Sequence, residues 1–326
     1  MKILVLGGTK FVGRILVETA LANRHEITLF NRNKTNPKLF SDIEHLQGDR
    51  NSDLTPLHGR KWDVVIDTCG YVPRIVRKSA EMLAASVDHY ILISTISVYA
   101  DFSKPGIDEN SPLATIDDES VENVTNETYG PLKVLCEKAA AQTMPHRVLV
   151  LRPGLIVGPH DPSDRFTYWL IRMSQGGEVL APSPPQQQIQ FIDVRDLADF
   201  ILQMAVKKQS GIFNTTGPAY TLTMEEFLQE CMRITKATPG LTWVSEKFVL
   251  EYEMDLPVWV PSGWHGINKV NCQKAISAGL TFRPFAETIR DTLAWHSTRP
   301  QKYELKTGLR SKQEKEFLKT WHDKIG

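Results

Sequence analysis

A tyrosine and a lysine four residues apart, Tyr129 and Lys133, form the pair with the clearest chemical use in this sequence. Residues at this spacing lie on one face of a helix. An ammonium group beside a phenol favours the phenolate and lowers the tyrosine pKa, so the phenol can give and take a proton. The hydroxyl of Thr95 could hold the substrate oxygen that exchanges that proton. Because the spacing also arises by chance, the alternative is a surface helix whose tyrosine packs between domains.

Short apolar runs alternate with helical segments along the first half of the chain. Unbroken runs of this kind are typical of strands buried on both faces of a parallel sheet. The pattern predicts an α/β fold with a doubly wound parallel sheet, and a ligand lying across the carboxyl ends of its strands. The expected strands are 3–6, 26–30, 62–67, 90–94, 147–151 and 211–217, with a further strand end at 45–50, and the expected helices are 11–21, 73–87 and one from Tyr129.

Two lobes are expected. Residues 1–157 and about 189–217 should form a dinucleotide-binding Rossmann domain. Residues 158–188 and 218–326, approximately, should form a smaller, partly discontinuous α+β lobe that binds substrate. A capping box at Thr223–Glu226 predicts one of its helices, and Asp193 and Asp196 are expected to cap a helix or bridge the lobes.

A glycine-rich turn, Gly7 to Gly13, follows the first predicted strand and precedes the first predicted helix. This arrangement aims free backbone N–H groups at a phosphate. The alternative is a structural turn without a ligand. The small residues at 68–70, after another predicted strand, would leave room for the cofactor pyrophosphate and ribose.

The end of the second predicted strand bears on the choice of cofactor. An acidic residue there favours NAD, whereas an arginine suits the 2′-phosphate of NADP. This chain has no acid at that point and offers Asn31 and Arg32. We therefore predict NADP(H), with NAD(H) as the other possibility. The alternative for Arg32 is a solvated loop charge, and Asp49 is placed to accept from the adenine amino group.

Composition excludes several classes of protein. The chain has 326 residues, of which 41% are hydrophobic, and its 38 basic and 38 acidic residues balance. No broad basic field is implied, so nucleic acid is not favoured as the main partner. The four cysteines show no paired spacing, so we expect no metal site and a reducing, cytoplasmic setting. We expect no signal peptide and no membrane span.

Four strings in order resemble one known family: Gly7–Gly13, Ser94–Tyr99, Tyr129–Lys133 and Arg152–Pro159. They are similar to the extended short-chain dehydrogenase/reductases, in the group of NAD-dependent epimerase/dehydratases. The nearest likeness is to a bacterial branch labelled 2′-hydroxyisoflavone reductase-like, a label that is a weak guide to substrate.

The resemblance implies a role for each matching residue. Tyr129 would be the acid/base, Thr95 the hydroxyl that positions the substrate oxygen, and Lys133 the ribose contact that tunes the tyrosine. Together with the residue-based arguments, it gives an expected set of cofactor contacts: Gly7, Thr9, Lys10, Phe11, Val12, Gly13, Asn31, Arg32, Asp49, Arg50, Cys69, Gly70, Lys133, Gly154, Leu155 and Ile156. Tyr71, His160 and Arg165 are the expected substrate contacts.

Two departures from the family pattern affect the prediction. Lys10 stands where the family's middle glycine is usual, and its ammonium could instead pair with a 2′-phosphate. Thr68–Gly70 replaces the apolar-Ala-Ala string of many epimerases, which weakens a direct transfer of nucleotide-sugar epimerase activity.

Several functions remain open from the sequence. The leading one is hydride transfer between nicotinamide and a small-molecule carbonyl or alcohol. A nucleotide-sugar epimerase would use the same three residues, and a dehydratase ranks last because Ile96 and Ser97 follow Thr95. An RNA-binding protein or redox sensor that kept the fold is the alternative of another class. The loop with Trp259 and Trp264 could be a pocket wall, a lid or simply packed, and the family resemblance suggests a homodimer.

Overall fold

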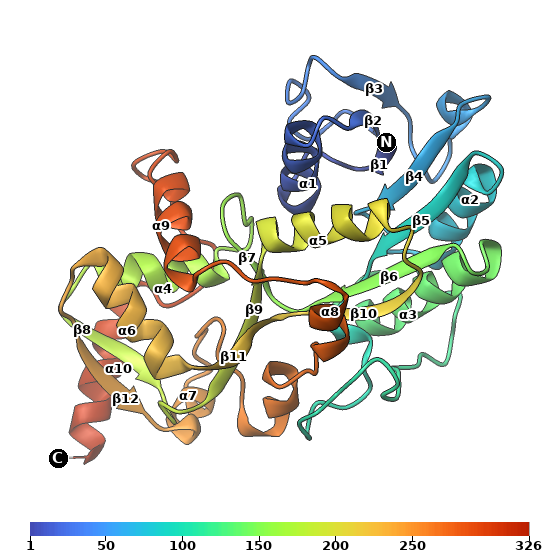
Figure 1. Cartoon of the computed structure of the whole chain (residues 1–326). Coiled ribbons are helices and arrows are strands. Elements are labelled where there is room, and N and C mark those ends of the chain that lie inside the picture. The colour runs from blue at the N-terminus through green and yellow to red at the C-terminus, as the bar shows by residue number, and fades with distance from the viewer. Residues whose placement is uncertain (326) are drawn as a thin grey trace.

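The computed structural model describes residues 1–325, and a parallel sheet of seven strands is its largest element. All neighbouring strands in this sheet run parallel. The predicted doubly wound parallel sheet is confirmed (Figure 1). Across the sheet, the strands are β10 (Gly211–Thr215), β6 (Val148–Pro153), β5 (Val87–Ile93), β4 (Trp62–Asp67), β1 (Lys2–Leu6), β2 (Glu26–Asn31) and β3 (Glu44–Gln47).

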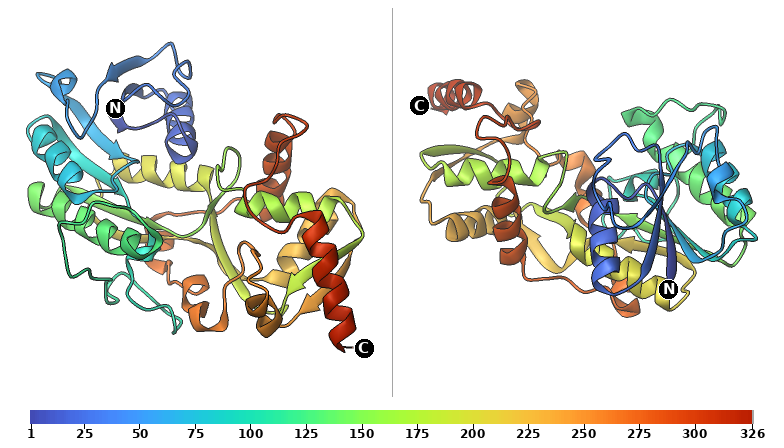
Figure 2. Two further views of the ribbon diagram at one scale, coloured as in Figure 1. Left: turned by 180° about the vertical axis from the view of Figure 1, so that it is seen from behind. Right: turned by 90° about the horizontal axis from the view of Figure 1, so that it is seen from above.

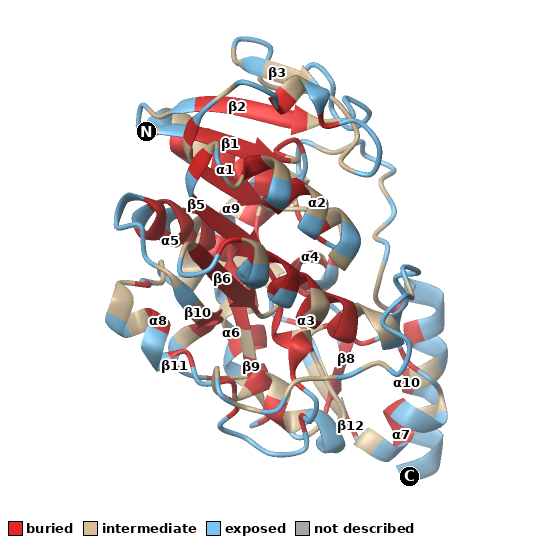
Figure 3. Ribbon diagram, turned by 90° about the vertical axis from the view of Figure 1, so that its right-hand side faces the viewer, coloured by how far each residue is buried: buried red, intermediate tan, exposed pale blue. Residues whose placement is uncertain are grey.

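Helices cover both faces of this sheet. Side chains alternate along a strand, so Ile3 and Val5 of β1 enter one apolar core while Leu4 and Leu6 enter another. Both cores are closed, which is why the strands are buried on each side (Figure 3). The first core is covered by α1 (Phe11–Ala22) and α5 (Val194–Val206), and the second by α2 (Pro73–Leu83) and α3 (Asn126–Thr143).

A second group of elements lies beside the large sheet and carries the C-terminus (Figure 2). It has its own aromatic-rich core. Its strands are β7 (Ile156–Val157), β9 (Gln188–Asp193) and β11 (Gly217–Thr223) in one sheet and β8 (Glu178–Pro182) and β12 (Gly240–Val244) in another. Its helices are α4 (Arg165–Ser174), α6 (Met224–Thr235), α7 (Glu246–Glu251), α9 (Phe285–His296) and α10 (Ser311–Ile325), while α8 (Gln273–Ala278) packs near β10.

Several predicted boundaries were wrong, and the predicted strand 211–217 is divided between β10 and β11, which belong to different sheets. The helix that begins at Pro73 ends at Leu83 rather than Val87, because the Ser86 N–H turns back to the Leu83 carbonyl, 2.8 Å away. Strand β5 then starts at Val87. Helix α3 begins at Asn126, before Tyr129, because Thr125 and Thr128 form a capping box there.

Asp193 joins the two groups of elements, as expected. It caps α5 by accepting from the Arg195 N–H, and it also accepts a hydrogen bond from Thr288 of α9 at 2.8 Å. Next to it, Asp196 pairs with Arg283 at 2.6 Å. The capping box of Thr223 and Glu226 at α6 is confirmed as well. Across residues 1–325, no helix has the length and apolar character to cross a membrane.

Candidate active site

The glycine turn after β1 leaves an open helix start. Gly7 and Gly8 have φ angles of +106° and +94°, a backbone region that disfavours other residues. A Cβ atom at Gly13 would lie 2.8 Å from the Gly8 nitrogen, so α1 begins close against the turn. The first turn of α1 holds no acidic residue and no side chain caps it, which leaves its N–H groups and positive dipole end for an anion.

Lys10 fits this turn without strain. Its φ of −139° and ψ of 135° are those of extended backbone, which any residue adopts. The family's middle glycine is therefore dispensable here, and the left-handed φ of +39° falls on Phe11 instead. The Lys10 side chain is exposed and lines the cavity described next.

A cavity of about 660 Å³ opens at the carboxyl ends of β1, β2 and β4. The cavity would accommodate a dinucleotide, because no side chain caps the start of α1 and the small residues after β4 leave space for the phosphates. Basic side chains outnumber acidic ones along it, with Lys10, Arg32, Lys34 and Arg50 against Asp49. The predicted residues that line it are Gly7, Thr9, Lys10, Phe11, Val12, Gly13, Asn31, Arg32, Asp49, Arg50, Cys69 and Tyr71.

Two of these side chains also shape the loops. The Asn31 amide donates to the Gly7 carbonyl at 3.0 Å and its oxygen accepts from the Asn33 N–H at 2.7 Å. The Asp49 carboxylate accepts from the Asn51 N–H at 3.0 Å. The adenine contact expected of Asp49 stays a prediction.

Arg50 is held by a buried ion pair that the sequence did not reveal. Both of its terminal nitrogens reach the Asp67 carboxylate, at 2.6 and 2.7 Å, and the Tyr90 hydroxyl donates to the same carboxylate at 2.7 Å. Despite burial, the pairing lowers the pKa of Asp67 and raises that of Arg50 well above its usual value. Arg50 is therefore bonded to the last residue of β4 at the cavity. Its contact with a cofactor stays a prediction.

Cys69 lies beside this pair. Its thiol is 3.4 Å from the Arg50 guanidinium and donates to the Leu6 carbonyl at 3.4 Å. Burial raises the pKa of the Cys69 thiol. A protonated, anchored thiol is a poor nucleophile, so this cysteine serves as a small wall residue.

Lys133 is almost fully buried at the carboxyl end of β5. Its ammonium donates to the Gly70 carbonyl at 2.6 Å and to the Ile93 carbonyl at 2.7 Å, which leaves one of its three N–H groups free of these partners. The ammonium also lies 5.5 Å from the centre of the Tyr71 ring. Burial lowers the pKa of Lys133.

Thr95 and Tyr129 are neighbours, since the Thr95 side chain acts on the Tyr129 hydroxyl. Thr95 is buried at the end of β5, where it caps the short 3-10 helix η2 (Ile96–Val98) and donates to the Ser97 hydroxyl at 3.1 Å. Tyr129 lies near the start of α3, shortly after the N-cap residue Thr125. The centre of its ring is 6.4 Å from that of Tyr71. Two elements distant in sequence, the end of β5 with Thr95 and helix α3 with Tyr129 and Lys133, thus supply the three residues.

The pKa of Tyr129 differs from the expectation. Burial raises it, and the Thr95 side chain and the positive charge of Arg165 oppose the rise without overcoming it. Lys133 is not among the groups that shift the pKa of Tyr129, and its ammonium donates to two backbone carbonyls. In this state, Tyr129 is a protonated phenol.

The turn between β6 and β7 holds the remaining predicted cofactor residues. The Gly154 N–H donates to the Thr215 carbonyl at 3.3 Å, and the Leu155 carbonyl accepts from the Ile192 N–H at 2.8 Å. Ile156 pairs with Ile192 in the small sheet. These bonds fix the turn at the carboxyl end of β6, outside the residues that line the dinucleotide cavity.

The three expected substrate residues lie in different surroundings. Tyr71 is 47% exposed at the cavity, and its partial burial, with the neighbouring Tyr129, raises its pKa to about 12. Arg165 is exposed near Tyr129, with its Nε 3.2 Å from the Ser163 hydroxyl. His160 instead contacts Arg14 at 3.3 Å and the Trp295 ring, so it is not brought to Tyr129 by any contact in the described residues.

A second cavity, of about 820 Å³, adjoins Tyr129. Sequence reasoning missed most of its walls, which come from η2, from the segment that follows it, from the start of α3, and from η3 (Ser262–Asn268). Trp264 of η3 stacks on Phe102 with ring centres 5.9 Å apart. Trp264 lines this cavity, whereas Trp259 packs against the aromatic-rich core. A role of the loop as a lid stays a prediction.

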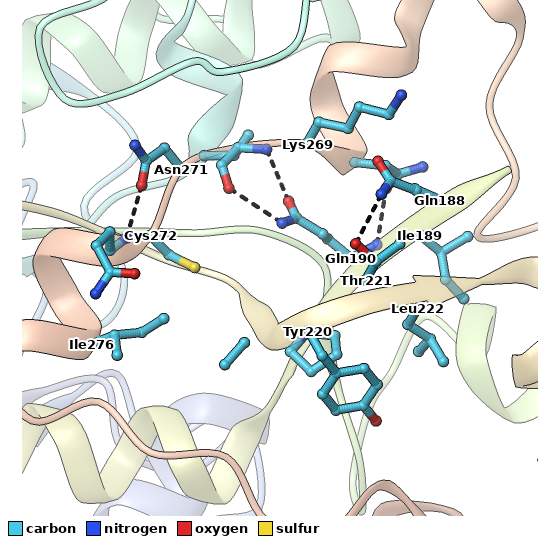
Figure 4. Close-up of a pocket in the computed structure, with 15 residues that line it drawn as sticks. Gln188, Ile189, Gln190, Tyr220, Thr221, Leu222, Lys269, Asn271, Cys272 and Ile276 are labelled. Atoms are coloured by element: carbon cyan, nitrogen blue, oxygen red, sulfur yellow. Dashed lines mark hydrogen bonds between the residues drawn. The ribbon is translucent and has the colours of Figure 1, made fainter.

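A third cavity, of about 260 Å³, lies between β9, β11 and residues 268–276. Its polar side chains already have partners in the same wall: the Gln190 amide pairs with both backbone groups of Val270 at 3.0 and 3.2 Å, and the Gln188 amide donates to the Thr221 hydroxyl at 3.1 Å (Figure 4). It contains none of the predicted site residues. Within residues 1–325, no cluster of His, Cys, Asp or Glu side chains could hold a metal ion.

A known protein family matches more than half of this chain. Residues 3–215 match the NAD dependent epimerase/dehydratase family. The chain belongs to that family. The narrower isoflavone reductase-like branch stays a prediction.

Relatives of known name are distant. The chloroplast stem-loop binding protein of 41 kDa b from Arabidopsis thaliana is 28% identical over 250 residues, which are 71% of this chain and 62% of that protein. The chain thus spans less than two thirds of that relative's length.

Two solved structures illustrate the likeness in fold. The UDP-Glc/GlcNAc 4-epimerase of Campylobacter jejuni has a TM-score of 0.69 at 14% identity, with 91% of this chain and 99% of that chain covered. The UDP-glucuronic acid 4-epimerase of Bacillus cereus, solved with NAD, has a TM-score of 0.67 at 16% identity over the same shares, 91% and 99%. At such identities the likeness concerns the fold alone.

Proposed function

We propose that this protein is an NADP(H)-preferring oxidoreductase that interconverts a small-molecule carbonyl and alcohol. The observation that carries the proposal is the meeting of Thr95, Tyr129 and Lys133 at the carboxyl end of β5, next to a cavity built for a dinucleotide. Membership of the NAD dependent epimerase/dehydratase family supports it.

Each residue has one task in this proposal. A bound nicotinamide supplies the site that gives or takes a hydride. Tyr129 passes its proton to the substrate oxygen during reduction and takes it back during oxidation. The Thr95 hydroxyl holds that oxygen at the end of η2. Lys133 offers its remaining N–H to the cofactor ribose while its bonds to Gly70 and Ile93 fix its position.

The preference for NADP(H) rests on charge. Lys10, Arg32 and Lys34 gather at the end of the cavity that follows β2, where an adenosine 2′-phosphate would lie. No acidic residue occupies that strand end. Calorimetric titration with NADPH and NADH tests this, and failure to bind either cofactor would overturn the proposed function.

Nucleotide-sugar epimerisation remains the alternative within the family, because it uses the same proton donor. The solved neighbours named above are epimerases of this kind. The two activities separate in one assay: a reductase consumes NADPH in step with product, whereas an epimerase changes the substrate without net consumption.

RNA binding is a candidate from another class, favoured by the name of the Arabidopsis relative. Balanced charge argues against it. Titration of a stem-loop RNA at two salt concentrations tests this candidate, since phosphate contacts make affinity fall steeply with salt.

The remaining proposals concern the two lobes, the cellular location and the oligomeric state. We infer that residues 1–157 with about 189–217 bind the cofactor and that the rest of the chain forms the substrate lobe. We also infer that the protein works in the cytoplasm with its four cysteines reduced. A homodimer through α2 and α3 is also proposed, although their outer surface exposes Arg77, Glu81 and Lys138. Light scattering would test it.

A further inference from the structure

The cavity beside Tyr129 has a preformed aromatic wall. Trp264 and Phe102 stack nearly parallel, with an angle of 22° between their rings. Their backbones are joined, since the Gly266 N–H donates to the Phe102 carbonyl at 2.7 Å. A Cβ at Gly266 would lie 2.2 Å from the Lys104 carbonyl oxygen, so the two segments are in tight contact. This wall is therefore held in place before any ligand arrives.

Exposed apolar side chains gather around Tyr129. Seven large hydrophobic side chains are exposed among the described residues. Two of them, Val124 and Trp264, line the cavity that Tyr129 also lines, and a third, Tyr71, lines the dinucleotide cavity with its ring centre 6.4 Å from that of Tyr129. Trp264 is 55% exposed even though it stacks on Phe102. Exposed aromatic surface next to a reactive group is typical of a site that covers it with a ligand.

Charge separates this cavity from the dinucleotide cavity. No lysine or arginine is among the described residues that line it, and Glu127 is its one ionisable carboxylate. Glu127 accepts a hydrogen bond from Thr125 at 2.6 Å, and this bond lowers its pKa, so it stays charged. Diphosphates and carboxylates are bound in proteins by cationic side chains. The lining of this cavity has none, and Arg165, whose charge acts on Tyr129, lies outside that lining.

We propose that the cavity bounded by Trp264, Phe102 and Tyr129 binds the reacting substrate, and that this substrate is an uncharged molecule with an aromatic ring. The ring lies against Trp264 and the carbonyl reaches the Tyr129 hydroxyl. The inference rests on the proposed function and narrows its substrate class. The inference disfavours sugar nucleotides as substrates, because their diphosphate would lie near Glu127 with no cationic side chain in the cavity lining.

Binding of three probes to the whole protein tests the substrate class. Acetylnaphthalene is a neutral aryl ketone, acetylnaphthoate adds a carboxylate to the same skeleton, and UDP-glucose is a sugar nucleotide. Calorimetry with and without saturating NADPH gives their dissociation constants. We expect acetylnaphthalene to bind about tenfold tighter than either anion. The inference is overturned if acetylnaphthalene does not bind or if an anion binds as tightly.

Single-residue variants test whether acetylnaphthalene binds in this cavity. Trp264→Ala should weaken acetylnaphthalene about tenfold, and Trp264→Phe should weaken it less. Tyr220→Ala is the matched control, because Tyr220 is 57% exposed at the third cavity, and it should change nothing. Thermal melts check that each variant folds. Equal affinities for wild type and Trp264→Ala would overturn the location.

Glu127→Gln provides a test that does not remove packing. Loss of its charge should tighten acetylnaphthoate severalfold and leave acetylnaphthalene unchanged. No change for acetylnaphthoate would contradict the role of charge. These readouts concern ketone binding, so they remain separate from the cofactor titration that tests the proposed function itself.

Discussion

The protonation state of Tyr129 follows from its surroundings. Burial raises its pKa above the ordinary tyrosine value of ~10, so the phenol keeps its proton through neutral pH. Reduction requires that proton and oxidation requires the phenolate. We therefore expect kcat/KM for reduction to stay level through neutral pH and to fall only in the alkaline range, while that for alcohol oxidation rises with pH. Rate profiles in both directions check this, and a reduction rate that falls across neutral pH would contradict it.

In the proposed function, Lys10 and Arg32 supply the preference for NADP(H). Because both line the dinucleotide cavity and no bond in the structure holds either ammonium or guanidinium elsewhere within residues 1–325, Lys10→Gly and Arg32→Asp should each weaken NADPH roughly fivefold. NADH, which lacks the 2′-phosphate, should lose less.

Lys38→Ala is the control for these variants, because Lys38 is exposed and lies outside the cavity lining. Titrations of both nucleotides give the comparison. Equal losses of NADPH and NADH affinity would remove the NADP(H) preference.

At the level of elements, β4 depends on one buried ion pair. Asp67 is fully buried and its pKa is lowered by Arg50. Asp67→Asn would leave the Arg50 charge without its partner and should reduce the free energy of unfolding by about 3–5 kcal/mol. Urea denaturation measures this, with the exposed Asp88→Asn as a control that should change little. A loss no larger than that of the control would contradict the structural role of the pair.

The same pair sets a pH dependence of stability. A carboxyl whose folded pKa is lowered stabilises the protein above its unfolded pKa and loses that contribution as pH falls through the folded value. Wild type should therefore lose stability on acidification more steeply than Asp67→Asn does. Parallel pH profiles for the two proteins would rule this out.

Local sequence signals predicted secondary-structure elements better than they predicted contacts between distant residues. The glycine turn and the capping box at Thr223 were found because their chemistry lies within a few residues. The Arg50–Asp67 pair and the Trp264–Phe102 stack were not, because each joins segments distant in sequence. For the same reason, the placement of His160 next to Arg14 on α1 could not be foreseen.

For the whole molecule, the packing of the two groups of elements depends on Asp193. It caps α5 and also binds Thr288 of α9. Asp193→Ala should therefore cost about 2–4 kcal/mol, the sum of a lost cap and a buried hydrogen bond left without its acceptor. Denaturation curves measure the loss. Thr223→Ala, which removes a cap but no bridge, should cost only about 1 kcal/mol, and equal losses would contradict a bridging role.

The overall architecture was largely predictable because buried parallel strands leave an unmistakable apolar pattern. The substrate side was less so, since its walls come from loops and from the second half of the chain, where periodicity carries little information. The spacing of Tyr129 and Lys133 predicted that they share a helix, and they do; the role of Lys133 at the site stays a prediction. The expected lowering of the Tyr129 pKa was wrong, because the buried surroundings of the phenol are set by the tertiary fold.

The most direct test of the central claim compares wild type with Tyr129→Phe in two measurements on the same protein: NADPH affinity by calorimetry and ketone-dependent NADPH oxidation. In the proposed function, the phenol hydroxyl transfers the proton but is not needed to hold the dinucleotide. The variant should therefore bind NADPH nearly as well as wild type and lose turnover by a factor of about a hundred or more. Turnover equal to that of wild type would contradict the account.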